Sequence, residues 1–276
     1  MTTSALLVGC DFSSSPSKRK QIVIAWGEAA GDRVLLKQLQ FFSSLQNFSE
    51  CLHTPGPWVG GFDLPFGLPR ELVETLAWPT DWLACMQHFT KLSREDIRAQ
   101  FAAFCNQRPV GGKFAHRTTD LPAGSSPSMK WVNPPVAFMM HAGVPLLIQA
   151  GVHFPGLHDG DRQRVALEAY PGMWARRVLQ RQSYKNDAAA KQTGERWLAR
   201  KNLLHALVWG HDDLPVRLKL SSAMADTLVD DASGDSLDAV ICMMQAAWAQ
   251  QRFEQGDALY GLPPDMDRLE GWIVNA

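Results

Sequence analysis

The sequence predicts an α/β protein in which one mixed β-sheet is flanked by helices, with a largely helical or irregular insertion in the middle of the chain. Two observations lead to this prediction. Short apolar runs of strand length end at turn residues or at an acidic residue, and longer segments with apolar positions at helical spacing alternate with them. The composition, with 46% hydrophobic and 20% charged residues in 276, allows a full core and excludes a disordered chain.

The first 63 residues predict the element order β-β-β-α-β. Apolar runs and turn residues indicate strands at 5–10, 21–26, 33–42 and 58–62 and a helix at 43–53. The short turns between the first three strands are typical of an antiparallel meander. Asp11 directly follows the first strand and Asp63 directly follows the fourth.

The rest of the chain is less regular until it approaches its end. A helix is expected at 95–106, a strand at 164–170, and helices at 191–209 and 235–253. The segment 109–135 is rich in Pro, Gly, Ser and Thr, and an irregular stretch of that length usually carries function. We expect a single domain over residues 1–276, with a core of about 1–70 and 162–276 and an insertion of about 71–161.

Charge is distributed unevenly along the chain. The formal net charge is −1, but residues 1–90 carry −2, residues 91–201 carry +9 and residues 202–276 carry −8. The total excludes a uniformly basic chain that binds polyanions indiscriminately. A basic middle beside an acidic end indicates a region that faces a polyanion next to a carboxylate-rich site, although solvated helix faces would explain the basic residues as well.

Cysteine usage and hydropathy indicate a cytoplasmic protein with no membrane association. The five cysteines are scattered and never spaced as CxxC, which argues against a disulfide framework or a zinc knuckle. No apolar run approaches the roughly 18 residues that cross a bilayer. Residues 1–4 contain no basic residue of the kind that opens a secretory signal.

Five acidic residues occupy positions that core packing does not explain: Asp11, Asp63, Glu168, Asp235 and Asp238. The first two end strands, Glu168 lies within one, and the last two open the final helix. Strand ends at one edge of an α/β sheet converge on a crevice, where ligands usually bind. Carboxylates gathered there repel one another unless cations compensate them. Mg²⁺ or Mn²⁺ is the expected cofactor, because hard divalent ions prefer carboxylate oxygens.

Four of these residues also have ordinary structural interpretations. Asp235 is a good N-cap, and Asp238 lies in a first helical turn, where the helix dipole favours a negative charge. Asp11 could anchor the turn at 13–15 through its side chain, and Asp63 could be a simple turn former. Each interpretation is plausible for one residue, whereas all four together at these positions are less so.

Four segments carry a resemblance to a known family. They are GCDFSSSP at 9–16, GGFDLPFGLP at 60–69, ALEAYPGMWA at 166–175 and DSLDAVICMMQAAWA at 235–249. In this order they resemble the motifs of domain-of-unknown-function family 429, which is regarded as a family of predicted nucleases with the ribonuclease H-like fold. The first and last segments are also similar to those of bacterial Holliday-junction resolvases. The resemblance implies a five-stranded mixed sheet, with three antiparallel strands, between helices.

The resemblance also implies roles for the acidic residues. Asp11, Asp63 and Asp238 would be metal ligands, and Asp235 would be a fourth. Glu168 matches the E-x-x-P position of the family, to which a catalytic role is assigned. The function implied is a divalent-metal-dependent nuclease or phosphodiesterase in which metal ions activate a water that attacks the phosphorus.

Basic residues of the middle segment are expected to contact the substrate, a nucleic acid or another phosphodiester. The candidates are Lys113, Arg117, Lys130 and Lys185, with Phe114, Trp131 and Tyr184 interleaved. Cations beside aromatic rings provide phosphate contact and base stacking. The alternative for each is a basic side chain whose stem packs on apolar surface.

Two other functions remain open at this stage. Residues 11–18 resemble the phosphate-binding hairpin of sugar kinases and actin-like ATPases, which handle ATP or sugar phosphates. Those enzymes usually need a duplicated fold, and the chain shows no internal repeat. The second alternative is a catalytically inert ribonuclease H-like module that binds nucleic acid or a protein.

Overall fold

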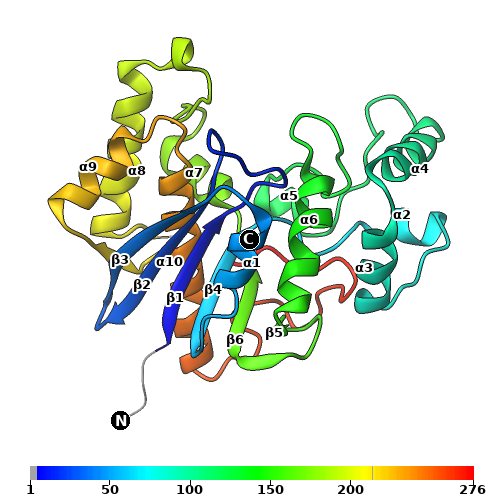
Figure 1. Cartoon of the computed structure of the whole chain (residues 1–276), viewed down its shortest axis with the longest axis horizontal. Helices are drawn as coiled ribbons and strands as arrows, with labels where there is room; N and C mark the ends of the chain where they lie inside the picture. The colour runs from blue at the N-terminus through cyan, green and yellow to red at the C-terminus, as the bar shows by residue number, and fades with distance from the viewer. Residues whose placement is uncertain (1–4, 213) are drawn as a thin grey trace.

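Seven strands form one sheet in the computed structural model, which describes residues 5–212 and 214–276 (Figure 1). The strands are β1 (Leu6–Asp11), β2 (Ile22–Ala30), β3 (Arg33–Phe42), β4 (Trp58–Asp63), β5 (Val152–His153), β6 (Asp161–Glu168) and β7 (Arg217–Lys219), in the spatial order β5-β6-β4-β1-β2-β3-β7. Residues 1–4, which belong to the expected core, lie outside the described residues. The predicted α/β class is confirmed.

Only β2 runs against its neighbours. It pairs antiparallel with β1 and with β3, whereas all other neighbouring strands are parallel. The predicted meander over the first three strands is therefore correct. The sheet has seven strands rather than the five implied by the resemblance. The two additional strands are the edge strands β5, of two residues, and β7, of three residues. Strands so short leave no readable apolar pattern.

The described ranges contain ten α-helices. They are α1 (Leu45–Cys51), α2 (Arg70–Thr75), α3 (Trp82–Lys91), α4 (Arg94–Asn106), α5 (Asp120–Ala123), α6 (Val136–Gln149), α7 (Pro171–Leu179), α8 (Gly194–Trp209), α9 (Ser222–Asp230) and α10 (Asp235–Glu254), with a 3₁₀ turn at Ala189–Lys191. The sequence predicted α1, α4, α8 and α10 but not the other six. The longest of those six, α6, is apolar nearly all round and contains Pro145.

Alternate residues of the strands face two different helical layers. Val8 and Cys10 of β1 belong to the core on one face, which is shared with α1–α4 and α6, whereas Leu7 belongs to the core on the other face, shared with α7–α10. Figure 1 shows α2, α3 and α4 on the right of the sheet and α8 and α9 on the left. Of the helices in the middle of the chain, α2, α3, α4 and α6 thus contribute to the core of one face of the sheet, whereas Ala123 of α5 packs in a small separate cluster.

Two glycines let α10 pack directly on the strands. A Cβ at Gly9 would lie 2.0 Å from the carbonyl oxygen of Ala239, and one at Gly61 would lie 2.4 Å from the carbonyl oxygen of Cys242. No side chain fits in either place. The backbone of α10 therefore touches β1 and β4, which fixes the position of its first turn relative to the ends of these strands.

None of the helices in the described ranges is long and apolar enough to cross a membrane. The five cysteines are all free thiols, and four of them are buried.

Candidate functional site

Asp11 and Asp63 lie side by side at the carboxyl ends of β1 and β4. The two strands pair in parallel, with Gly9 opposite Gly61 and Asp11 opposite Asp63. Residues two apart on a strand point to the same face of a sheet, so both aspartates share the face on which α10 packs. Throughout the described ranges, the side chain of Asp11 makes no hydrogen bond to the turn at 13–15, which argues against the turn-anchor interpretation.

The other two aspartates come from the first turn of α10. Asp235 is its first residue and Asp238, which is fully buried, follows one turn later. The N-cap is Gly234, so the prediction that Asp235 caps the helix is wrong. Asp231 instead provides a hydrogen-bond acceptor for the first turn of α10, because its Oδ2 accepts the Ser236 backbone N–H at 2.8 Å. The carboxylate of Asp235 is thereby left for other contacts.

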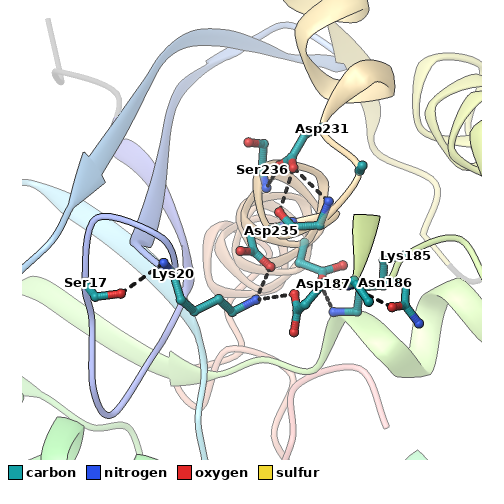
Figure 2. A network of polar contacts seen from close by, with 12 residues as sticks. Ser17, Lys20, Lys185, Asn186, Asp187, Asp231, Asp235 and Ser236 are labelled. Atoms are coloured by element: carbon teal, nitrogen blue, oxygen red, sulfur yellow. Dashed lines mark hydrogen bonds and ion pairs between the residues drawn. The ribbon is translucent and has the colours of Figure 1, made fainter. Parts of the chain in front are cut away.

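A lysine from the loop between β1 and β2 reaches Asp235. The Nζ of Lys20 lies 2.7 Å from Asp235 Oδ1 and 3.3 Å from Asp187 Oδ1, as Figure 2 shows. The neighbouring Ser17 Oγ accepts the backbone N–H of Lys20 and orders this loop. The bond to Asp235 raises the pKa of Lys20 in spite of its partial burial.

A second lysine pairs with Asp238. The ammonium of Lys185 donates to Asp238 Oδ2, and the hydroxyl of Tyr184 donates to Asp238 Oδ1. Burial lowers the pKa of Lys185, but the charges of Asp238, Asp11 and Tyr184 and the hydrogen bond to Asp238 together raise that pKa well above the usual value. Lys185 is therefore an ammonium ion among carboxylates.

Asp11, Asp63, Asp235 and Asp238, called here the acidic cluster, carry more negative charge than their lysines compensate. In the part of the chain that the structure describes, no cation forms an ion pair with Asp11 or Asp63. Burial raises the pKa of Asp11 well above its usual value, and the charge of Asp238 adds to this effect. Burial also raises the pKa of Asp63 to about 7, although Lys185 opposes the shift. If all four aspartates are ionised, their four negative charges and the two positive charges of Lys20 and Lys185 leave a net charge of −2.

The donor atoms of the acidic cluster suit a divalent cation. Carboxylate oxygens are the ligands that Mg²⁺ and Mn²⁺ prefer, and the uncompensated charge on Asp11 and Asp63 favours a further cation. As the side chains stand, no group of three or more His, Cys, Asp or Glu residues between residues 5 and 276, Asp213 apart, is arranged to hold a metal ion. Asp238 could join Asp11 and Asp63 as a ligand only if the ammonium of Lys185 moved away.

Glu168 belongs to a different group, here called the arginine cluster: Arg117, Asp120 and Glu168. Arg117 donates to both carboxylate oxygens of Glu168, at 2.6 and 2.8 Å, and to Asp120 at 3.0 Å. The backbone N–H of Phe66 gives Glu168 a further hydrogen bond, at 2.9 Å. Burial raises the pKa of Glu168, and Arg117 opposes the shift. The catalytic role of Glu168 stays a prediction, since its carboxylate is already bound by an arginine.

The four expected substrate-binding residues separate into two pairs. Arg117 and Lys185 line a cavity beside Asp63, whereas Lys113 is exposed elsewhere and Lys130 is half-buried outside the cavity. Arg117 is only 2% exposed, and its guanidinium is shared between two carboxylates. We therefore interpret Arg117 as a positioning residue and not as a phosphate contact. The rings of Phe114 and Trp131 pack against each other on the core, with their centroids 5.4 Å apart.

The cavity has a volume of about 340 Å³ and adjoins the acidic cluster. Its lining includes the charged residues Asp63, Arg117, Glu168 and Lys185, and most of its remaining surface is apolar. The insertion, β4 and its following residues, and the segment after β6 all contribute to its walls. An apolar pocket with a few convergent polar groups is the usual form of a ligand site.

Sequence reasoning missed several residues of both clusters. Nothing local singles out Lys20 as the partner of Asp235, because 215 positions separate them. The pair of Arg117 and Asp120 could have been found, since residues three apart often form ion pairs. Glu270 is a further buried carboxylate, which accepts the backbone N–H groups of Arg70 and Thr118.

Comparison of the chain with protein-family models, with curated proteins and with solved structures gives no match. The family resemblance of the four segments therefore stays a prediction.

Proposed function

We propose that the protein is a divalent-metal-dependent phosphodiesterase, with nucleic acid as its substrate and a ribonuclease H-like core. The observation that carries this proposal is the pair formed by Asp11 and Asp63. They are opposed in register at the ends of two parallel strands, largely buried, and without an ion-pair partner among the described residues. Buried carboxylates so arranged are costly unless a cation binds them.

The arrangement of the strands supports the ribonuclease H-like assignment. The antiparallel β1, β2 and β3, followed by α1 and the parallel β4, give the order expected for that core. The other two aspartates of the acidic cluster, Asp235 and Asp238, come from α10, which packs on β1 and β4, as the motif resemblance implies. The arrangement thus agrees with the resemblance at the positions of Asp11, Asp63 and Asp238.

Each residue has a task in this proposal. Asp11, Asp63 and Asp238 would hold the metal, with Asp235 as a further carboxylate beside it. A bound divalent ion supplies an activated water and stabilises the charge that develops on the phosphate. With a metal ion compensating the charge of Asp238, the ammonium of Lys185 would be free to bind a phosphate oxygen. Lys20 would keep the charge of Asp235 compensated.

The experiment combines metal binding with cleavage. Mn²⁺ is titrated into the protein by calorimetry, and cleavage is measured on bis(p-nitrophenyl) phosphate and on labelled oligonucleotides with Mg²⁺ or Mn²⁺. The variants Asp11→Asn and Asp63→Asn should lose Mn²⁺ binding and at least 100-fold in rate, a loss on the scale of a catalytic metal ligand. Asp226→Asn, at an exposed position of α9, is the matched control and should behave as wild type.

Three results would contradict the proposal. Mn²⁺ binding that is unchanged in both variants would place the metal elsewhere or show that none binds. Nucleic-acid binding with no turnover under any divalent ion would favour the inert binding module. A rise in melting temperature with ATP would favour the nucleotide-dependent alternative. Circular dichroism of each variant separates these results from misfolding.

A further inference from the structure

The cavity beside Asp63 has features that a metal site alone does not require. A site that only cleaves a phosphodiester needs carboxylates, a metal and cations for the phosphate, all of which the acidic cluster and Lys185 could provide. The cavity extends the site by about 340 Å³, within the range of roughly 300–1,000 Å³ typical of small-molecule pockets. Its walls are largely apolar, so they suit a ligand part that carries no charge.

The walls come from parts of the chain that the arginine cluster holds together. Val136 and Met139 of α6 form one side, Leu64 and Pro65 after β4 form another, and Ile273 closes it from the last segment of the chain. Arg117 links three such parts, because it bonds to Glu168 on β6, to Asp120 of α5 and to the backbone oxygen of Glu270. The pocket is therefore formed in advance of binding rather than shaped by the ligand.

Polar groups at the edge of the cavity suit a flat heterocycle better than a hydrocarbon. Ser125, Ser126 and Tyr170 are part of the lining, and the centroid of the Tyr170 ring lies 5.2 Å from the guanidinium carbon of Arg176. Ser125 is bonded to Asp120 at 2.9 Å. Nucleobases that leave the base stack are bound by this combination of aromatic or apolar walls and a few hydrogen-bonding groups.

We propose that the cavity receives one unstacked nucleobase of a single-stranded nucleic acid, next to the phosphate that meets the acidic cluster. This inference rests on the proposed function and adds the substrate class to it. A base in an intact duplex is paired and stacked, so it enters the cavity only if the duplex opens, at a cost of a few kcal/mol. Single strands are therefore the preferred substrates.

The test fills the cavity without altering the acidic cluster. Met139→Trp places a large ring in the cavity, and Gln149→Trp is the matched control, since Gln149 is exposed on the same helix. Binding of a fluorescent single-stranded oligonucleotide and of its duplex is measured in Ca²⁺. Rates are compared for thymidine 5′-(p-nitrophenyl phosphate) and methyl p-nitrophenyl phosphate, which share the scissile bond, whereas only the first carries a nucleoside.

Met139→Trp should bind the single strand at least 10-fold more weakly, the scale of losing one stacked base. It should also lose the preference for the thymidine ester, while Gln149→Trp keeps both. Equal single-strand affinity in the two variants, no single-strand binding by wild type, or a preference for the duplex would overturn the inference. Mn²⁺ binding should be the same in wild type and Met139→Trp. Loss of Mn²⁺ binding in Asp63→Asn tests the proposed function separately. A failure of the base-binding inference can therefore be told apart from a failure of the proposed function.

Discussion

The acidic cluster and the arginine cluster lie at the same edge of the sheet, and both contain buried carboxylates. They differ in how the negative charge is compensated. The arginine cluster sets two carboxylates around one guanidinium that bonds to both of them, with backbone N–H groups completing the bonds. The acidic cluster has four carboxylates and two lysines, and Asp11 and Asp63 have no ion-pair partner within the described ranges. The first arrangement suits a structural joint, and the second suits a site that takes up a cation.

The largest effect is expected from the arginine cluster. Arg117→Met would leave Glu168 and Asp120 buried without their cation, which should cost about 3–5 kcal/mol of unfolding free energy. Urea unfolding measures this loss. Arg162→Met is the matched control, because Arg162 is exposed in its pair with Asp159 and such pairs contribute about 0–1 kcal/mol. Equal, small losses in the two variants would contradict the structural role of the arginine cluster.

The acidic cluster should respond to neutralisation in the opposite sense. In metal-free buffer, Asp63→Asn removes a charge that its neighbours repel, so unfolding free energy should rise by roughly 0.5–2 kcal/mol. Glu168→Gln, the same kind of change in the arginine cluster, should lower it, since Arg117 loses a charged partner. Urea unfolding of both variants with a chelator present gives the comparison. A similar loss in both would show that the two clusters do not differ as described.

The pH dependence of stability should show the same contrast. The pKa of Asp63 is about 7 in the folded protein, against about 3.9 in an unfolded chain. Between these values the folded state binds the extra proton, so stability in metal-free buffer should fall as the pH rises from 4 to 7. Asp63→Asn should reduce this slope, and saturating Mg²⁺ should do the same in wild type. A slope that is identical in wild type and variant would show that Asp63 is not the group responsible.

The smallest effect concerns the lysines of the acidic cluster. Lys185→Met removes the ammonium that competes with a metal for Asp238, and Mn²⁺ should bind roughly 5- to 10-fold more tightly, or about 1 kcal/mol. Lys20→Met should change the affinity less, because Lys20 is half-exposed and contacts Asp235 rather than Asp238. Calorimetric Mn²⁺ titration distinguishes the two. Weaker binding in Lys185→Met would mean that Lys185 helps to assemble the site instead of competing for it.

The positions of the four aspartates could be predicted from sequence because they depend on local patterns. An apolar strand that ends in an aspartate can be recognised from its own residues, whichever strand it pairs with. The apolar residues of α10 recur at helical spacing. The spacing from Gly9 to Asp11 and from Gly61 to Asp63 also places glycine and aspartate on one face.

The compensating charges could not be predicted in the same way. Lys185 and Lys20 lie 53 and 215 positions from their aspartates, and only the folded chain brings them together. The burial of Arg117 was missed for a related reason, since it depends on Glu168 and on the last segment of the chain. Charge along the sequence indicated a basic middle but not which basic residues turn inward.

The packing of α10 on Gly9 and Gly61 also has a consequence for the order in which the protein matures. The strands that carry Asp11 and Asp63 leave the ribosome long before Asp235, which follows Asp63 by 172 positions. Until α10 docks on these strands, the acidic cluster lacks half of its carboxylates. If the acidic cluster holds a metal, as proposed, that site would form only once α10 has docked, in the final step of folding.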